Sequence, residues 1–424
     1  MKTVSKDQSN LLASTVVQIT DPLQGTTSIQ GNIGNMSDTQ LTEDAIDTPA
    51  EISVQNLICF SHLRWDFVFQ RPQHLMTRAA RQWRVFFVEE PVFSDTQEIV
   101  SFNERNENNL WVITPQFPAT LSHTEARQEQ ENILKTLIEK YRIEDYVAWY
   151  YTPMALAFGQ NLTPKVTIYD CMDELSAFKG APPELLEWEQ QLLQKADIVY
   201  TGGLSLYEAK RDRHPFVRAF PSSIDKDHFA KAHRAVEPAD QATIEAPKFG
   251  FYGVIDERFD IDLLRDLAER RPDWHFIIIG PVVKIDPATL PQNPNIHYLG
   301  MKSYEQLPAY LAGWDVALLL FARNESTRFI SPTKTPEYLA AHRPVVSTPI
   351  TDVIRPYGEV GLVHIAESAE EFEQAIEKAL NEAGNTQWQQ RVDEFLANNS
   401  WDYTWQQMQQ LITKLAETKT RHMA

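Results

Sequence analysis

Short apolar runs separated by polar and helical stretches begin at Val54 and recur along most of the chain. The first five runs are Leu57–Phe60, Val85–Val88, Trp111–Ile113, Val166–Tyr169 and Ile198–Tyr200. Continuous apolar runs that alternate with helical stretches are typical of parallel strands buried on both faces. We therefore expect residues 51–232 to form an α/β domain.

The same pattern restarts beyond an alanine- and charge-rich stretch, residues 233–247, which we interpret as a linker. Helical segments such as Ile261–Glu269 and Tyr304–Ala312 alternate with further apolar runs, so residues 248–395 should form a second α/β domain. Its predicted strands are Phe249–Tyr252, Phe276–Ile279, Val316–Phe321, Val345–Val346 and Leu362–Ile365. Two such units in succession favour a pair of facing Rossmann-like domains, with a ligand in the cleft at the carboxyl ends of the strands.

The two ends of the chain differ from this middle part. Residues 1–50 contain no aromatic residue and are rich in Ser, Thr, Gln and Asn, so they are predicted to be a disordered tail. Residues 396–424 should form an amphipathic helix that packs back on the body of the protein. Its large apolar side chains recur at helical intervals, at Trp401, Trp405, Met408, Leu411 and Leu415.

The charge balance narrows the possible partners. The 424 residues hold 58 Asp and Glu against 39 Lys and Arg, a net charge of −19, which repels nucleic acid and anionic lipid. Two cysteines, Cys59 and Cys171, are too few for a disulfide framework. No segment has the pattern of a signal peptide or the ~18 apolar residues of a membrane span. We expect a cytoplasmic protein that binds no nucleic acid and is soluble or at most peripheral at the inner face of the membrane.

Several common cofactor motifs are absent. Neither Gly-x-Gly-x-x-Gly nor Gly-x-x-x-x-Gly-Lys-Ser/Thr occurs, which disfavours a dinucleotide-dependent dehydrogenase and a P-loop ATPase. Asp170 and Asp173 form one carboxylate pair without further ligands nearby, which is weak evidence for a metal site. We predict no cofactor, no metal site and a metal-independent reaction.

The most informative segment is residues 331–348. Thr335, Pro336 and Glu337 have the residue types of an N-cap and the first two positions of a helix. Free amides at such a helix start suit a diphosphate, and Lys334 would add a full positive charge. Glu337 would then lie near a sugar hydroxyl pair. The alternative is that Glu337 only complements the helix dipole and that Lys334 is solvated.

This segment resembles a known family. Pro332-x-Lys334-x-x-Glu337-Tyr-Leu-Ala-Ala, followed by Arg343-Pro-Val-Val-Ser-Thr348, resembles the donor-site segment of GT-B glycosyltransferases, particularly the large retaining family that uses nucleotide-sugars (family 4-like, group 1). The resemblance implies a diphosphate contact for Lys334 and a contact with the nucleotide ribose for Glu337. It also implies the GT-B fold, in which two Rossmann-like domains face each other.

The resemblance extends through the second domain and, less strongly, into the first. Phe249-Gly-Phe-Tyr-Gly253, followed by Asp256-Glu-Arg258, looks like the family's first strand and glycine-bearing turn, with Arg258 as a second diphosphate cation. Phe60–Asp66, Gln70–Leu75 and Tyr169–Glu174 look like a branch of bacterial polysaccharide glycosyltransferases. The donor-binding residues that the resemblance implies are Gly253, Arg258, Gly280, Met301, Ser331, Lys334, Thr335 and Glu337.

One position departs from the family pattern. Many retaining members carry a second glutamate eight positions before the ribose-binding one, and Phe329 stands there in this chain. Glu325 or Asn324 in the preceding loop could replace it. The residue that contacts the donor sugar and the stereochemistry of transfer therefore stay open in the sequence.

Glycosyl transfer builds negative charge on the departing nucleoside diphosphate. Fixed cations and backbone amides that point at this charge lower the barrier where the charge develops. We assign this role to Lys334, Arg258 and the amides of residues 335–337, in place of a metal.

If the reaction inverts the sugar, a base must take the acceptor proton. Asp66, His62 and Asp173 are the candidates, because each follows a predicted strand at the cleft end. The simpler alternatives are a capping role for the two aspartates and a backbone contact for the histidine.

A basic stretch in this acidic chain adds a second hypothesis. If residues 71–82 form a helix, then Arg71, His74, Arg78 and Arg81 fall on one face, which we call the arginine stripe. We expect the stripe to meet a phosphate-bearing acceptor, such as a lipid-linked sugar, or the membrane surface that carries it. The alternative is a solvated helix face whose charges pair with surface acids.

The sequence thus predicts a glycosyltransferase of the hexosyltransferase class. Its donor would be a nucleotide-diphosphate sugar and its acceptor a glycan or a lipid-linked sugar. The resemblance implies a retaining reaction in bacterial surface or exopolysaccharide synthesis. The alternatives are a sugar-nucleotide epimerase or a phosphorylase of the same fold, and a catalytically silent partner subunit that binds a glycan or a nucleotide.

Overall fold

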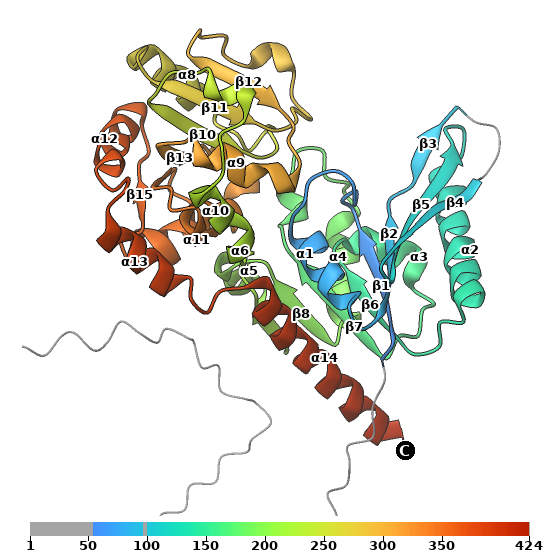
Figure 1. Cartoon of the computed structure of the whole chain (residues 1–424). Helices are drawn as coiled ribbons and strands as arrows, with labels where there is room; N and C mark the ends of the chain where they lie inside the picture. The colour runs from blue at the N-terminus through green and yellow to red at the C-terminus, as the bar shows by residue number, and fades with distance from the viewer. Residues whose placement is uncertain (1–53, 96–99, 424) are drawn as a thin grey trace, which may run out of the picture. The chain divides into compact units, whose positions relative to one another are not determined.

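The structure is a computed structural model that describes residues 54–95 and 100–423 (Figure 1). The described residues belong to one compact unit. The predicted disordered tail, residues 1–50, lies outside them.

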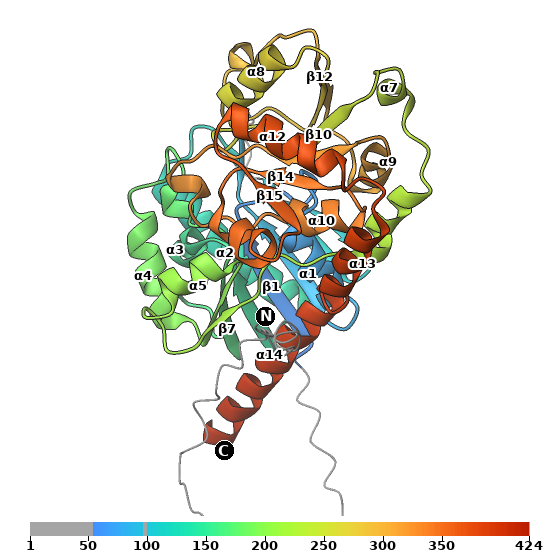
Figure 2. The same cartoon turned by 90° about the vertical axis from the view of Figure 1, so that its left-hand side faces the viewer.

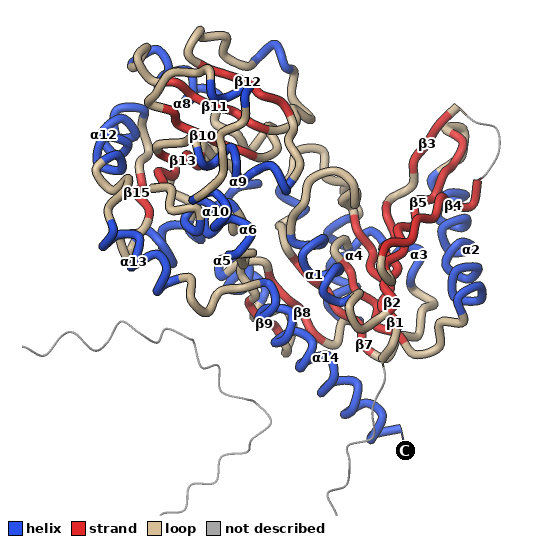
Figure 3. The backbone as a smooth tube through the Cα atoms, in the orientation of Figure 1, coloured by secondary structure: helices blue, strands red, loops and turns tan. Residues whose placement is uncertain are grey.

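The first domain is built on a mixed sheet that has nine strands in the described part of the chain (Figure 3). The strand order is β3-β5-β2-β1-β6-β7-β8-β9 with parallel neighbours, and β4 pairs antiparallel with β5. The strands are β1 (Asn56–Ser61), β2 (Arg84–Glu89), β3 (Val92–Ser94), β4 (Val100–Glu107), β5 (Leu110–Pro118), β6 (Tyr146–Tyr150), β7 (Val166–Cys171), β8 (Ile198–Thr201) and β9 (Val217–Ala219).

The second domain holds a separate parallel sheet of six strands within the described residues. Its order is β12-β11-β10-β13-β14-β15. The strands are β10 (Lys248–Tyr252), β11 (His275–Ile279), β12 (Ile296–Gly300), β13 (Val316–Leu319), β14 (Val345–Ser347) and β15 (Val363–Ile365). The predicted pair of Rossmann-like domains is therefore confirmed.

Both sheets are buried on two faces, which explains the continuous apolar runs in the sequence. Leu57 and Cys59 of β1 belong to one apolar cluster, while Ile58 and Phe60 belong to a cluster on the opposite face. The strand β11 divides its side chains between two clusters in the same way. The runs predict ten strands of the two sheets, but they miss β6, because three of its five residues are Tyr or Trp. They also miss β3, β4, β9 and β12.

Helices surround both sheets, as Figures 1 and 2 show. Those next to the first sheet are α1 (Arg71–Ala79), α2 (His123–Tyr141), α3 (Leu156–Gly159), α4 (Leu185–Lys195) and α5 (Leu204–Lys210). The later helices are α6 (Lys226–Phe229), α7 (Ala239–Ala242), α8 (Ile261–Arg270), α9 (Leu307–Ala312), α10 (Lys334–Ala340), α11 (Thr351–Val353), α12 (Ala369–Leu380), α13 (Thr386–Phe395) and α14 (Trp401–Met423). Among the helices of the described residues, none is long and apolar enough to cross a membrane.

The interval interpreted as a linker, residues 233–247, is held against the second domain. Gln241 is buried, and its amide nitrogen donates to the backbone oxygen of Tyr310 over 3.0 Å. The indole nitrogen of Trp314 donates to the side-chain oxygen of Gln241 over 2.9 Å. These contacts fix the interval to the domain that follows it.

The C-terminal helix α14 is present as predicted, and it packs on the first domain. Trp401, Trp405 and Met408 belong to the same apolar cluster as β1. The Tyr200 hydroxyl donates to the backbone oxygen of Met408 over 3.2 Å. The chain therefore returns to its first sheet after completing the second.

The prediction of an exposed arginine stripe on α1 is wrong, because α14 covers that face. Arg71, His74 and Arg78 are only 3%, 1% and 6% exposed. The ring of His74 stacks on Trp401 with 4.6 Å between the ring centres. Arg78 and Arg81 both bind the carboxylate of Asp402, at 2.9 and 2.5 Å. The stripe is a contact within the molecule and offers no continuous surface to an acceptor or a membrane.

Candidate active site

A cavity of about 530 Å³ lies between the two domains, and we call it the cleft pocket. Both sheets supply its walls at their carboxyl ends. His62 and Asp173 follow β1 and β7, while Gly253 and Phe321 follow β10 and β13. This position agrees with the site that topology predicts for two facing α/β domains.

Lys334 lines the cleft pocket at the start of α10. Its ammonium lies 5.8 Å from the ring centres of Phe251 and Phe321, and it forms no hydrogen bond or ion pair among the described residues. Burial lowers the pKa of Lys334, Glu337 opposes that shift, and the positive charge of Arg258 adds to it. A partly buried cation that forms no ion pair with the described residues is costly, so this position favours an anionic ligand.

Two glycines make room for this lysine. Gly253 has a φ of 148°, and a Cβ atom at this position would lie 2.3 Å from Cε of Lys334. Gly280 has a φ of 143°, and a Cβ atom there would lie 1.8 Å from the backbone oxygen of Gly253. Gly253 therefore lines the pocket, whereas Gly280 supports Gly253 from outside it.

Arg258 lies beside Lys334 in the pocket lining. Its guanidinium binds the carboxylate of Asp256 through Nε and Nη2, at 2.7 to 3.2 Å. It also lies over the ring of Phe178 from the first domain, 5.3 Å from the ring centre. Asp256 neutralises much of this charge, so Lys334 is the more available cation.

Asp173 lines the pocket from the first domain, and its carboxylate has no hydrogen bond or ion pair among the described residues. Burial raises the pKa of Asp173, and Arg258 opposes the shift. Its presumed partner in the sequence, Asp170, is fully buried and binds Arg71 through both oxygens at 2.9 to 3.2 Å. In the described part of the chain, no group of three or more His, Cys, Asp or Glu side chains is arranged to hold a metal ion.

Glu337 is buried at 4% exposure and also lines the cleft pocket. The Tyr252 hydroxyl donates to Oε2 of Glu337 over 2.5 Å. Burial raises the pKa of Glu337, while the bond from Tyr252 and the charge of Lys334 oppose the shift. The tyrosine fixes the orientation of the carboxylate and leaves Oε1 without a partner among the described residues.

The predicted start of α10 is wrong by two residues, since the N-cap is Thr333 and not Thr335. The Thr335 amide donates to Pro332 O over 3.3 Å, and the Glu337 amide donates to Thr333 O over 3.4 Å. Pro336 has no N–H. The amides of residues 335–337 are thus not free for a diphosphate, and the cations must supply the charge.

The remaining predicted donor residues lie in different places. Ser331 lines the cleft pocket, and its backbone oxygen accepts a hydrogen bond of 2.6 Å from the Ser222 hydroxyl across the domains. Thr335 is fully buried and outside the pocket lining. Met301 is 47% exposed and also lies outside the lining.

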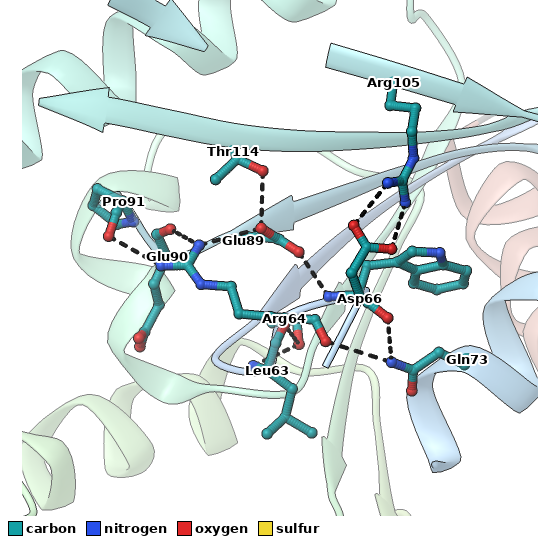
Figure 4. Close-up of polar contacts among 11 residues, drawn as sticks. Leu63, Arg64, Asp66, Gln73, Glu89, Glu90, Pro91, Arg105 and Thr114 are labelled. Carbon is teal, nitrogen blue, oxygen red and sulfur yellow. Dashed lines mark hydrogen bonds and ion pairs between the residues drawn. The ribbon is translucent and has the colours of Figure 1, made fainter. Parts of the chain in front are cut away.

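Of the other two candidate bases, only His62 lies in the cleft. Nδ1 of His62 is buried and has no hydrogen-bond partner in the part of the chain that the structure describes. Burial and the charge of Lys284 lower the pKa of His62 to about 4. Asp66 lies outside the pocket lining, is 67% exposed and binds Arg105 through both oxygens at 2.7 and 2.8 Å (Figure 4). The assignment of Asp66 as a base in the cleft is therefore wrong.

A comparison with known families decides the class of this site. Residues 247–382 match the family model described as "Glycosyl transferases group 1". The matched range contains Gly253, Arg258, Lys334 and Glu337, which meet in the cleft pocket. The protein is a glycosyltransferase with a group 1 domain.

Among curated proteins, this glycosyltransferase is similar to a putative teichuronic acid biosynthesis glycosyltransferase, TuaH, of Bacillus subtilis (strain 168). The two are 21% identical over 280 residues, which cover 61% of this chain and 70% of the relative. The match extends well beyond the length of the group 1 domain, so part of it lies in the first domain.

Solved structures show the same fold at low identity. The sucrose-phosphate synthase of Thermosynechococcus elongatus superposes with a TM-score of 0.64 at 15% identity and covers 86% of this chain and 100% of its own. The catalytic domain of starch synthase IV from Arabidopsis thaliana, bound to ADP and acarbose, gives 0.61 at 10% identity and covers 86% and 99%. The fold of the glycosyltransferase is GT-B.

Phe329, at the position of the usual second glutamate, packs against the apolar cluster of the first domain. Asn324 caps a short 3-10 helix and donates to the Glu257 backbone oxygen over 2.8 Å. Glu325 is 79% exposed on its side chain and lies 3.8 Å from Arg328. None of these three residues lines the cleft pocket, so neither suggested substitute reaches it.

Sequence reasoning missed a buried acid that holds the loop bearing His62. Glu89, at the end of β2, is 6% exposed and accepts the Trp65 amide at 2.7 Å and the Thr114 hydroxyl at 2.8 Å. It also binds Arg64 at 3.2 Å, as Figure 4 shows. A charged residue at the end of an apolar run is the one sequence signal that could have found it.

A second missed network holds the loop that bears Asp173. Lys210 is 1% exposed and binds Glu174 at 2.7 Å and Glu189 at 2.6 Å. Glu174 directly follows Asp173, so the buried lysine fixes the backbone next to this pocket carboxylate. Lys210 lies 21 residues from Glu189 along the chain, and nothing in the sequence pattern couples them.

Proposed function

We propose that this glycosyltransferase moves a hexose from a nucleotide-diphosphate sugar to a glycan or lipid-linked acceptor, in the synthesis of a bacterial cell-surface polysaccharide. The observation that carries the proposal is the Lys334 ammonium, which lines the cleft pocket without a counter-ion from the described residues. The name of the Bacillus relative supports the polysaccharide part.

In this proposal Lys334 and Arg258 bind the diphosphate of the donor. Breaking the bond between sugar and phosphate moves negative charge onto the diphosphate, and a fixed cation stabilises that charge as it develops. Glu337, oriented by Tyr252, accepts hydrogen bonds from the ribose hydroxyls of the nucleotide. These roles need no metal ion, and we propose a metal-independent reaction.

We further propose that the reaction retains the anomeric configuration, as the resemblance of the donor segment implies. If the product is inverted, Asp173 and His62 are the two candidate bases, because both line the cleft pocket. The raised pKa of Asp173 makes its carboxylate a stronger base than an ordinary aspartate. The lowered pKa of His62 leaves its imidazole neutral at pH 7 but weakly basic.

The test is a panel of UDP-, GDP- and dTDP-sugars incubated with and without extracted bacterial glycans. Release of the nucleoside diphosphate that requires the glycan supports transfer, whereas sugar rearrangement without an acceptor supports the epimerase. Nuclear magnetic resonance of the product gives its anomeric configuration, and chelation by EDTA tests the metal independence.

The Lys334→Ala variant tests whether the activity depends on the cleft pocket. We expect it to lower turnover by ~10²–10³-fold, which corresponds to the ~3–4 kcal/mol lost when one such donor is removed. Lys378→Ala, at an exposed position of α12, is the matched control. Full activity of Lys334→Ala would refute the donor site.

A further inference from the structure

A second cavity of about 260 Å³ adjoins the cleft pocket on the side of the first domain. The two cavities share Glu90, Thr152 and Met154 in their linings, so they adjoin at these three residues. The second cavity is smaller than the roughly 300–1,000 Å³ of an independent ligand site. Its size and its position favour the interpretation that the second cavity is an extension of the cleft pocket.

Two kinds of side chain line this extension. Phe93 and Phe158 supply aromatic surface, and Phe93 is 48% exposed. His123, Arg127 and Gln130 follow one another at spacings of four and three on the first two turns of α2 and also line the cavity. Among the described residues, no hydrogen bond or ion pair occupies the side chains of these three polar residues.

Glu90 lies at the junction of the two cavities. Its backbone oxygen is fixed by Nη1 of Arg64 at 2.5 Å. Figure 4 shows its carboxylate turned away from that guanidinium, and this carboxylate has no hydrogen bond or ion pair in the described chain. Glu90 keeps an exposed surface, yet partial desolvation of its carboxylate raises its pKa, with the charges of Arg64 and Lys284 opposing the shift.

The lining of the second cavity combines aromatic surface with hydrogen-bonding groups that have no partner among the described residues, and a saccharide fits this combination best. A sugar ring has apolar C–H faces, which pack on aromatic rings, and hydroxyls, which need both donors and acceptors. An alkyl chain would bury Arg127 and Gln130 without partners, at a cost in free energy. The lining therefore favours a saccharide over the lipid part of an acceptor.

We propose that this cavity binds the second sugar of a glycan acceptor, so that the enzyme extends an existing chain rather than a single sugar. Glu90 lies where hydroxyls of the two terminal sugars meet. Arg127, Gln130 and the ring of Phe93 bind the sugar behind the reacting one. The inference rests on the proposed function, because only an acceptor in the cleft pocket would continue into this cavity.

The experiment measures binding of the labelled full-length protein to an array of neutral and acidic bacterial oligosaccharides of one to six sugars. We compare the wild type with Arg127→Ala and with Gln130→Trp, which fills the cavity from α2. Lys135→Ala is the matched control, since Lys135 lies two turns further along α2 at 60% side-chain exposure. Far-ultraviolet circular dichroism confirms that each variant is folded.

The proposal predicts that the wild type binds one or more oligosaccharides at least tenfold more tightly than the matching monosaccharide. Arg127→Ala and Gln130→Trp lose this gain, and Lys135→Ala keeps it. Equal binding of mono- and oligosaccharides, or a length preference that survives both variants, or no glycan binding by the wild type, overturns the proposal.

A thermal-shift measurement with UDP, GDP and dTDP on the same four proteins tells the two hypotheses apart. If a nucleotide stabilises all four proteins while the array shows no preference for oligosaccharide length, only the proposal that the second cavity binds an acceptor sugar is refuted. If no nucleotide stabilises the wild type, the proposed function itself has failed.

Discussion

Two groups of cations in this acidic glycosyltransferase differ in whether they form ion pairs within the protein. On α1, Arg71 is bound by both oxygens of Asp170, and Arg78 and Arg81 share the carboxylate of Asp402. In the cleft pocket, whose lining also includes Arg71, the ammonium of Lys334 forms no ion pair among the described residues, and the carboxylates of Glu337, Asp256 and Asp173 act on it only through longer-range attraction. The first group stabilises the fold, and the second is available to a ligand.

The difference shows that local charge in the sequence does not identify an anion site. The acids that neutralise the arginine stripe lie 99 and 324 positions away from their arginines along the chain. A window of sequence around α1 contains the cations without those partners and therefore looks like a basic patch. What distinguishes a binding cation is the absence of a counter-ion in the folded protein.

The largest expected effect comes from breaking the buried pair on α1. Arg71→Ala leaves the fully buried carboxylate of Asp170 without its cation and should lower the free energy of unfolding by ~3–5 kcal/mol. Urea denaturation measures the loss. The double variant Arg71→Met with Asp170→Leu should be much less destabilised, and a single variant as stable as the wild type would contradict the role of this pair.

A smaller effect on the fold, with a clear effect on activity, is expected for Gly253→Ala. The new Cβ atom would meet Cε of Lys334 at 2.3 Å, so the backbone is strained and the ammonium is displaced. We expect a loss of ~1–3 kcal/mol in urea, with transferase activity falling at least tenfold. Gly384→Ala, at a φ of 76° with no atom within 4 Å, should show the backbone strain without the loss of activity.

The pH dependence of donor binding distinguishes the two groups of cations further. The pKa of Lys334 is lowered by burial, so Lys334 is charged below this lowered pKa and loses its proton as the pH rises through it. Affinity for a nucleoside diphosphate should be full near neutral pH and should fall several-fold before the ordinary lysine range of ~10.4. Calorimetry at increasing pH measures this, and Lys334→Arg, which stays charged, should show no fall. If the affinity of the wild type did not change with pH over this range, then Lys334 would not lose its proton at a lowered pKa.

The smallest effect is expected at the exposed end of the stripe. Arg81 and Asp402 are 62% and 57% exposed, so Arg81→Ala should change the free energy of unfolding by no more than ~1 kcal/mol. Flotation with anionic liposomes should give equal binding for the wild type and Arg81→Glu, because the rest of the stripe is buried. A clear loss of liposome binding in Arg81→Glu would restore the membrane hypothesis.

The sequence predicted the two sheets and the place of the site for a physical reason. Parallel strands covered on both faces leave continuous apolar runs, and residues directly after such runs reach the cleft. His62 and Asp173 were found in this way, whereas Gly253 was implied by the family resemblance. Residue types alone left the roles of Lys334 and Glu337 open, and the resemblance of their segment to the donor-site segment of GT-B glycosyltransferases implied them.

What sequence reasoning missed depends on contacts between distant parts of the chain. Asp66 follows the same strand as His62, but its pairing with Arg105 draws it away from the cleft. The start of α10 was misjudged because Thr335 and Pro336 have the residue types of a helix start, while Thr333 already has helical backbone angles. Glu89 could be recognised only once β2, β5 and the loop after β1 were placed together. The second cavity could be recognised only once the start of α2 was placed beside the ends of β1 and β2.

Titration calorimetry can show whether Lys334 binds the diphosphate of the donor. The protein is titrated with the nucleoside diphosphate that the thermal-shift panel selects and, separately, with the matching nucleoside. Lys334→Ala should weaken the diphosphate by at least tenfold, about 1.4 kcal/mol, and leave the affinity for the nucleoside unchanged. Equal affinity of the wild type and Lys334→Ala for the diphosphate would show that Lys334 does not bind it.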